Sequence, residues 1–183
     1  MKGLIVLGNG FEDVEAISVI DVLRRSKLEI DTVTNNKTLE VETAFGITLY
    51  AQKFLKDVNE KDYDFLVIPG GRAVRTVWGN DRDLPELITK FVTAKKLVAA
   101  ICAGPLLVGR LGYYKDLPYT CFPGSETYIT AGKYSPKEGV ITAGNFITAK
   151  AMGYAIDFGL AIIEYLQGQR QREQIYQSIR GEL

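Results

Sequence analysis

The chain has 183 residues, 46% of them hydrophobic, and its 22 basic side chains equal its 22 acidic ones. This length can bury a core without disulfides, so one domain over residues 1–183 is expected, and the balanced charge leaves no basic field for nucleic acid. Two cysteines are too few for a disulfide scaffold, and the lack of histidine removes the usual zinc ligands and any Cys-His or Ser-His pair. No metal or cofactor is therefore expected.

The first residues, "MKGLIVLGNG", contain an apolar run that is too short for a signal peptide or a membrane span. A cytoplasmic protein with no membrane partner is therefore expected.

Apolar runs typical of strands alternate along the chain with segments of helical period. In chain order they are "KGLIVL" (2–7), "EDVEAISVIDVLRRS" (12–26), "LEIDTVT" (28–34), "FLVI" (65–68), "LPELITKFVTAKK" (84–96), "LVAAI" (97–101), "GVITA" (139–143) and the helical "AKAMGYAIDFGLAIIEYLQG" (149–168). Residues 40–51 alternate enough for an antiparallel excursion around Gly46, whereas residues 112–139 show little period. The order predicts an α/β fold: a mostly parallel sheet with helices on both faces.

Three predicted strands end in small or unusual residues. "GNGFEDVE" follows the first, "PGGRA" follows "FLVI", and "CAGP" follows "LVAAI". In open α/β sheets, ligands bind beyond the carboxyl ends of the strands. If the three strands are neighbours, one pocket brings together Glu12, Gly70, Gly71, Cys102, Ala103 and Gly104.

Cys102 has two readings. A thiol between a strand and a helix amino terminus gains backbone donors and a favourable dipole, which would lower its pKa below the free value of about 8.5. Pro105 suits the first turn of that helix. Cysteine is equally often a small buried hydrophobe, and "AAICAG" is an apolar context. The residues alone leave both readings open.

Glu12 and the two glycines are also ambiguous. An acid in the first turn of a helix ordinarily compensates the helix dipole, but Glu12 could instead face the thiol as a protonated hydrogen-bond donor. Gly70 and Gly71 could form a plain turn or aim a backbone N–H at an oxyanion.

A dinucleotide site is a weaker alternative. "GNGFED" supplies Gly-x-Gly after the first strand, and Asp31 lies near the distance expected for a ribose-binding acid. Asp13, however, stands where the third glycine of that fingerprint belongs.

Together, "GFEDVE", "VIPGG" and "AAICAGP" resemble the DJ-1/PfpI (ThiJ) superfamily, in particular its DJ-1-like branch. "VIDVLRRS" and "DFGLAIIEYLQG" resemble that branch's first and late helices, so the likeness runs nearly end to end. The resemblance implies a flavodoxin-like three-layer sandwich, a homodimer, and Cys102 at a strained nucleophile elbow. It further implies that Glu12 bonds the sulfur and that the N–H groups of Gly71 and Ala103 form an anion-binding hole.

The chain departs from the family pattern at three places. Ala103 follows Cys102 where the protease-like branch has histidine, which argues against a Cys-His peptidase. In "YTCFP", Phe122 occupies the position of a histidine common in the DJ-1-like branch, with Cys121 before it. "KAMGYA" replaces a Gly-Pro-Gly turn before the last long helix. Gly70, Cys121 and Phe122 are therefore possible pocket residues.

Two functions remain open, with small aldehydes or oxidants as the partners. Cys102 could add to 2-oxoaldehydes such as methylglyoxal in glyoxalase III or deglycase chemistry, with Glu12 as proton shuttle. Alternatively, it could sense oxidative stress through a stabilised sulfinate without turnover, in a redox-sensing or chaperone-like dimer. Because Phe122 replaces the histidine, we expect slow turnover and ready oxidation.

Overall fold

A seven-stranded sheet lies at the centre of the computed structural model, which describes residues 1–182. Its order is β10-β11-β7-β6-β1-β2-β5, and every pairing is parallel except that of β10 with β11. The strands are β1 (Lys2–Val6), β2 (Glu29–Thr34), β5 (Lys53–Phe54), β6 (Phe65–Ile68), β7 (Leu97–Ile101), β10 (Val140–Ala143) and β11 (Phe146–Ala149). The mostly parallel sheet expected from the sequence is confirmed.

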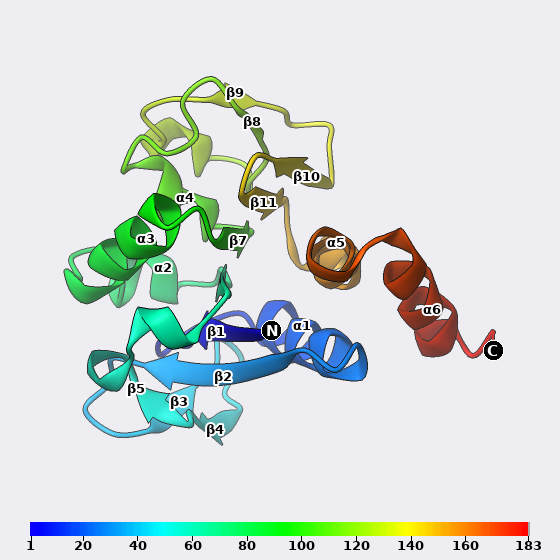
Figure 1. Cartoon of the computed structure of the whole chain (residues 1–183). Helices are drawn as coiled ribbons and strands as arrows, with labels where there is room; N and C mark the ends of the chain where they lie inside the picture. The colour runs from blue at the N-terminus through cyan, green and yellow to red at the C-terminus, as the bar shows by residue number, and fades with distance from the viewer. Residues whose placement is uncertain (183) are drawn as a thin grey trace.

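Helices cover both faces of this sheet. Figure 1 shows α1 (Asp13–Arg25), α5 (Ala155–Gln167) and α6 (Gln169–Arg180) on one side, with α3 (Asp83–Thr93) and α4 (Pro105–Gly109) on the other. The remaining short segments are α2 (Ala73–Thr76), the 3₁₀ turns η1 (Leu55–Asp57), η2 (Glu60–Asp62), η3 (Glu126–Tyr128) and η4 (Met152–Tyr154), and the paired strands β3 (Glu40–Glu42) with β4 (Thr48–Tyr50) and β8 (Pro118–Tyr119) with β9 (Lys133–Tyr134). The result is a three-layer sandwich.

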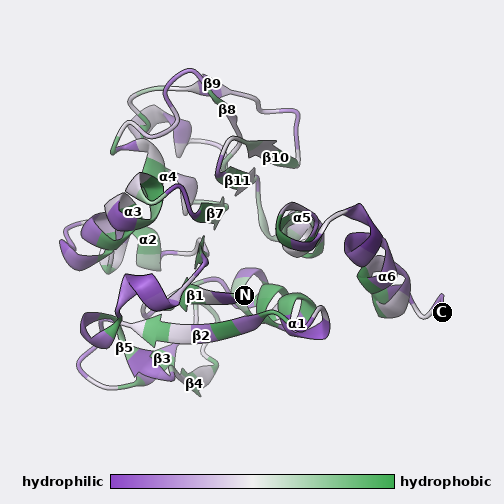
Figure 2. Cartoon of the chain, viewed as in Figure 1, coloured by the Kyte–Doolittle hydropathy of each residue, from purple (hydrophilic) through white to green (hydrophobic). Residues whose placement is uncertain are grey.

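The central strands follow from their composition. Every residue of β6 and β7 is buried, as expected for parallel strands covered on both faces. Helix α1 carries acids in its first turn and Arg24 and Arg25 in its last, which complements the helix dipole. The first turn of α6 contains no acidic residue, and Figure 2 shows that it is strongly hydrophilic. Within residues 1–182, no helix combines the length and apolar character needed to cross a bilayer.

Two expectations about the second half were incomplete. β11 was missed, and the late helix starts at Ala155 rather than at residue 149. A four-residue apolar run is too short for its period to distinguish strand from helix. Ala149 instead ends β11 opposite Ile101, and η4 precedes the helix. The antiparallel excursion at residues 40–51 is confirmed as the β3–β4 hairpin.

Asp31, the candidate ribose-binding acid, lies in an ion-pair network on β2. Its carboxylate is 2.9 Å from the Lys2 ammonium and 2.8 Å from that of Lys53, and it accepts a hydrogen bond from the Tyr63 hydroxyl. Burial opposes its ionisation, but these partners outweigh burial and lower the pKa of Asp31 to about 2. The carboxylate is thus already held by two cations.

One face of α1 carries apolar side chains outside the core. Val14 and Ile17 are 41% and 44% exposed, and the neighbouring hairpin adds Phe45 at 77%. A hydrogen bond from the Thr43 hydroxyl to Asp13 joins the hairpin to this end of α1. We propose that these side chains form the contact of a homodimer, because grouped exposed apolar side chains mark association surfaces.

An Ile17→Glu variant is expected to sediment as a 20.3 kDa monomer at a micromolar concentration where the wild type sediments as a dimer. A buried charge without a partner is strongly unfavourable at such a contact. Tyr165→Glu on α5, where Tyr165 is 42% exposed, is the matched control and should leave the dimer intact. A monomeric wild type would contradict the proposal.

Candidate active site around Cys102

The carboxyl ends of β1, β6 and β7 lie side by side. This is the arrangement under which the sequence predicts that the candidate residues share one pocket. The loop after β1 is tied to the loop after β6, because the Glu12 N–H donates to the Gly70 carbonyl and Phe11 bridges to Gly71. Cys102 directly follows β7. The three loops therefore build one site.

Cys102 has a left-handed backbone conformation, with φ of 62°. For a residue with a Cβ, this conformation costs on the order of 1–3 kcal/mol, and it persists only where the surrounding structure enforces it. Its own N–H donates to the Ala149 carbonyl at 2.9 Å, and Pro105 opens α4 three residues later. The strand, the turn and the helix thus hold the thiol of Cys102, which is partly buried, above the end of the sheet.

The carboxylate against Cys102 is that of Glu15, not Glu12. Glu15 is 1% exposed and hydrogen-bonds with the thiol, whereas Glu12 is the extended residue that caps α1 and lies at the pocket lining. The sequence-based placement of Glu12 on the sulfur was wrong because α1 begins at Asp13. Glu15 lies in the first turn, on the helix side that packs inward with Val19 and Val22.

The two carboxyl oxygens of Glu15 have different surroundings. Oε2 accepts the Gly70 N–H at 2.8 Å. Oε1 is buried, and no N–H or O–H group of residues 1–182 donates to it. A neutral Glu15 would have an O–H to donate to the neighbouring sulfur, which suits a thiolate better than a thiol.

Burial dominates the electrostatics of this pair. It raises the pKa of Glu15 to about 7, against the smaller opposing effects of hydrogen bonds with Cys102 and Gly70. Burial and the Glu15 carboxylate also raise the pKa of the Cys102 thiol, although backbone N–H groups oppose the shift. The expected lowering of the Cys102 pKa is therefore wrong. Because like charges resist sharing a buried site, the pair loses one proton near neutrality and holds the second strongly.

Backbone donors surround the sulfur as well. The N–H groups of Gly71 and Ala103 hydrogen-bond with Cys102. Gly71 reaches this position with φ of 86°, which glycine adopts without penalty. At Gly70, a Cβ would come within 2.7 Å of both the Cys102 Cβ and Glu15 Oε2, so only glycine allows the approach.

A pocket of about 560 Å³ opens over the thiol. Its lining consists of Glu12, Gly71, Arg72, Arg75, Cys102, Ala103, Phe122, Pro123 and Ser125. Phe122 is 49% exposed, and its N–H donates to the Cys102 carbonyl at 2.8 Å. The residue that replaces the expected histidine therefore borders the thiol. The two arginines were not identified from the sequence.

Cys121 lies outside this pocket. It is fully buried, and burial raises the pKa of its thiol to about 12. It influences the ionisation of Tyr114 and Tyr119, whose stacked rings have centroids 5.2 Å apart. Cys121 is thus part of the packing behind the pocket, whereas its neighbour Phe122 faces the pocket.

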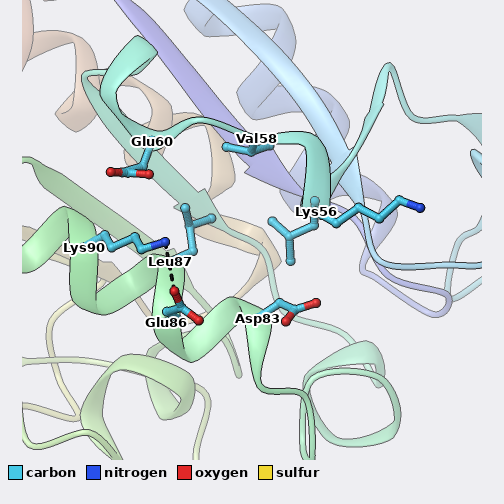
Figure 3. A pocket seen from close by; sticks show the side chains of 8 residues that line it. Lys56, Val58, Glu60, Asp83, Glu86, Leu87 and Lys90 are labelled. Atoms are coloured by element: carbon cyan, nitrogen blue, oxygen red, sulfur yellow. Dashed lines mark ion pairs between the residues drawn. The ribbon is translucent and has the colours of Figure 1, made fainter.

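Another pocket, of about 240 Å³, lies beside α3. Figure 3 shows its lining of mixed charge, with the Lys90 ammonium paired to Glu86 at 2.9 Å. Its lining contains no cysteine. Across residues 1–182, no three acidic or cysteine side chains gather as a metal site would require. The thiol pocket remains the candidate active site.

Comparison with known proteins identifies the family and the fold that this chain resembles. The model of the DJ-1/PfpI family matches residues 1–165. Protein DJ-1 homolog B of Arabidopsis thaliana is 30% identical over 94% of the chain, which spans only 39% of that protein. The glutathione-independent glyoxalase DJR-1.2 of Caenorhabditis elegans is 33% identical, with 86% of the chain and 85% of that protein covered. The solved structure of oxidized Toxoplasma gondii DJ-1 superposes with a TM-score of 0.88 at 28% identity, covering 97% of each chain. The fold is therefore flavodoxin-like.

Proposed function

The chain belongs to the DJ-1/PfpI family, and we propose that it converts small 2-oxoaldehydes to 2-hydroxy acids through Cys102, with Glu15 as the proton shuttle. The observation that carries this proposal is the contact between a partly buried thiol on a strained elbow and a buried carboxylate whose pKa is raised to about 7. A general base with a pKa near the working pH is the most effective. The glyoxalase named among the relatives supports the same chemistry.

The reaction begins with proton transfer from the Cys102 thiol to the Glu15 carboxylate. The thiolate adds to the aldehyde carbon, and the oxyanion that forms is stabilised by the N–H groups of Gly71 and Ala103 and protonated by Glu15. Glu15, ionised again, removes the hydrogen from the aldehyde carbon and returns a proton to the neighbouring carbon, while the hydroxyl proton on the former aldehyde carbon passes to the oxygen of the neighbouring carbon, which gives the thioester. Water then hydrolyses the resulting thioester, which releases the 2-hydroxy acid and restores the thiol.

Lactate formation from methylglyoxal by the purified protein, without added thiol, tests this function. The expected result is slow turnover, because only Glu15 is available as an acid–base group beside the sulfur. If no lactate formed at every pH tested between 6 and 9, the proposal would be contradicted.

Phe122→His is expected to raise this turnover, since a positioned acid–base group contributes about 10²- to 10⁴-fold and Phe122 lines the same pocket. The measurement is kcat/KM for methylglyoxal beside the rate of Cys102 oxidation, which should not change. Phe122→Leu is the control for altered packing. Equal turnover in all three proteins would show that a second proton carrier is not limiting.

Redox sensing is the second candidate. The Toxoplasma gondii DJ-1 whose structure superposes on this chain is in an oxidized form, which favours this alternative. In this chain, the Gly71 and Ala103 donors and a protonated Glu15 would stabilise a Cys102 sulfinate. Mass spectrometry after peroxide exposure would detect it, and equal oxidation of Cys102 and Cys121 would contradict a sensing role.

A further inference from the structure

Two guanidinium groups border the Cys102 pocket. Arg72 and Arg75 both line it, from the short segment that follows Gly71. Glu12 is the only acidic residue of the lining. Even when fully ionised, Glu12 balances only one of the two guanidinium groups. The residues that line the pocket therefore carry a net positive charge.

Neither guanidinium is neutralised by a carboxylate. Among the ion pairs formed by residues 1–182, none includes Arg72 or Arg75, and neither side chain makes a hydrogen bond there. These two leave their donors available to a ligand.

Arg72 and Arg75 are both exposed, but each side chain has a packing contact. The Arg75 guanidinium stacks over the Tyr128 ring, 5.3 Å from its centroid. The Arg72 stem passes beside Gly10, where a Cβ would meet its Cγ at 2.7 Å. Held arginines lose less entropy when they bind a planar anion, which they recognise with paired N–H groups.

We propose that the reactive molecule at Cys102 carries an anionic group, which Arg72 and Arg75 bind while the thiol attacks the carbonyl carbon. Resting on the proposed function, this narrows the substrate class to 2-oxoaldehydes with a carboxylate at the far end. Such a substrate reacts through the same bond changes as methylglyoxal, because its terminal carboxylate takes no part in the reaction. The anion directs the aldehyde toward the sulfur.

The first test needs no turnover, because it compares alkylation of Cys102 by iodoacetate and by iodoacetamide, which differ in charge. Peptide mapping gives the ratio of the two rates. In Arg72→Gln/Arg75→Gln, the ratio of iodoacetate to iodoacetamide is expected to fall about tenfold, and added salt should lower it in the wild type. Arg82→Gln/Arg170→Gln removes the same charge outside the pocket and is expected to keep the wild-type ratio. The same ratio in all three proteins would overturn the proposal.

The second test compares kcat/KM for 4,5-dioxopentanoate, a 2-oxoaldehyde with a terminal carboxylate, with that for methylglyoxal. In Arg72→Gln/Arg75→Gln, the ratio of kcat/KM for 4,5-dioxopentanoate to kcat/KM for methylglyoxal is expected to fall about tenfold relative to the wild type and to the control variant. Turnover of both aldehydes with an unchanged ratio would overturn anion recognition and leave the proposed function standing. A fall in the alkylation ratio without turnover of either aldehyde would support anion recognition and contradict the proposed function.

Discussion

Replacement of Cys102 with serine is expected to lower kcat for methylglyoxal by at least about 10³-fold. A serine hydroxyl at the same position keeps the hydrogen-bonding geometry, but Glu15 is too weak a base to ionise it. Serine has a Cβ like cysteine, so the strain at φ of 62° is unchanged and the fold should persist. The measurement is lactate formation beside thermal unfolding of both proteins.

The matched control for that substitution is Cys121→Ala. Cys121 is fully buried in the packing behind the pocket, so alanine should cost stability but not remove a reacting group. Turnover within about threefold of the wild type is expected where the variant is folded. If Cys102→Ser retained turnover while Cys121→Ala lost it, the assignment of Cys102 as the nucleophile would be contradicted.

The sequence predicted the parts of the fold that depend on local pattern. The runs "FLVI" and "LVAAI" are β-rich and apolar throughout, which only a central strand accommodates in this order of elements, and both are fully buried. β11 was missed since its pattern is four residues long, and what makes it a strand is its pairing with β7. That pairing is a long-range contact that no local window contains.

The candidate site was predicted to within one turn of a helix. Cys102, Gly71 and Ala103 lie together, because the ends of neighbouring parallel strands must meet. The choice between Glu12 and Glu15 depended on the residue at which α1 begins, and helix ends are the least certain part of a sequence-based prediction. The spacing of Glu15 from Val19 and Val22 places it on the buried stripe, which is the signal that could have identified it.

The prediction that the pKa of Cys102 is lowered was wrong for a different reason. A helix amino terminus and backbone donors favour the thiolate, and both are present around Cys102. The sequence did not reveal how far burial would counteract them. In the proposed mechanism, reactivity at Cys102 therefore depends on Glu15 to accept the proton rather than on a low thiol pKa.

Glu15→Gln is expected to lower kcat/KM for methylglyoxal by about 10²- to 10⁴-fold, because glutamine keeps the shape of the side chain but accepts no proton. In the wild type, kcat/KM should rise as the pH increases through about 7, where Glu15 ionises and can take the thiol proton. The variant should lack this rise. Glu12→Gln is the control at the pocket lining, and a larger loss there than at Glu15 would contradict the assignment.

Stability gives a readout of Glu15 that is independent of turnover. Its pKa is 4.5 in the unfolded reference and about 7 in the native protein, so between these pH values the native state holds a proton that the unfolded chain has released. The free energy of unfolding must then fall as the pH rises through this window, by about 3 kcal/mol in total. Glu15→Gln removes this term. Relative to the wild type, the variant should therefore gain about 3 kcal/mol between pH 4 and pH 8 in urea unfolding, whereas Glu12→Gln should gain much less. Parallel pH profiles for the wild type and Glu15→Gln would mean that the pKa of Glu15 is the same in the native and unfolded states, and would contradict a native Glu15 that holds its proton up to about pH 7.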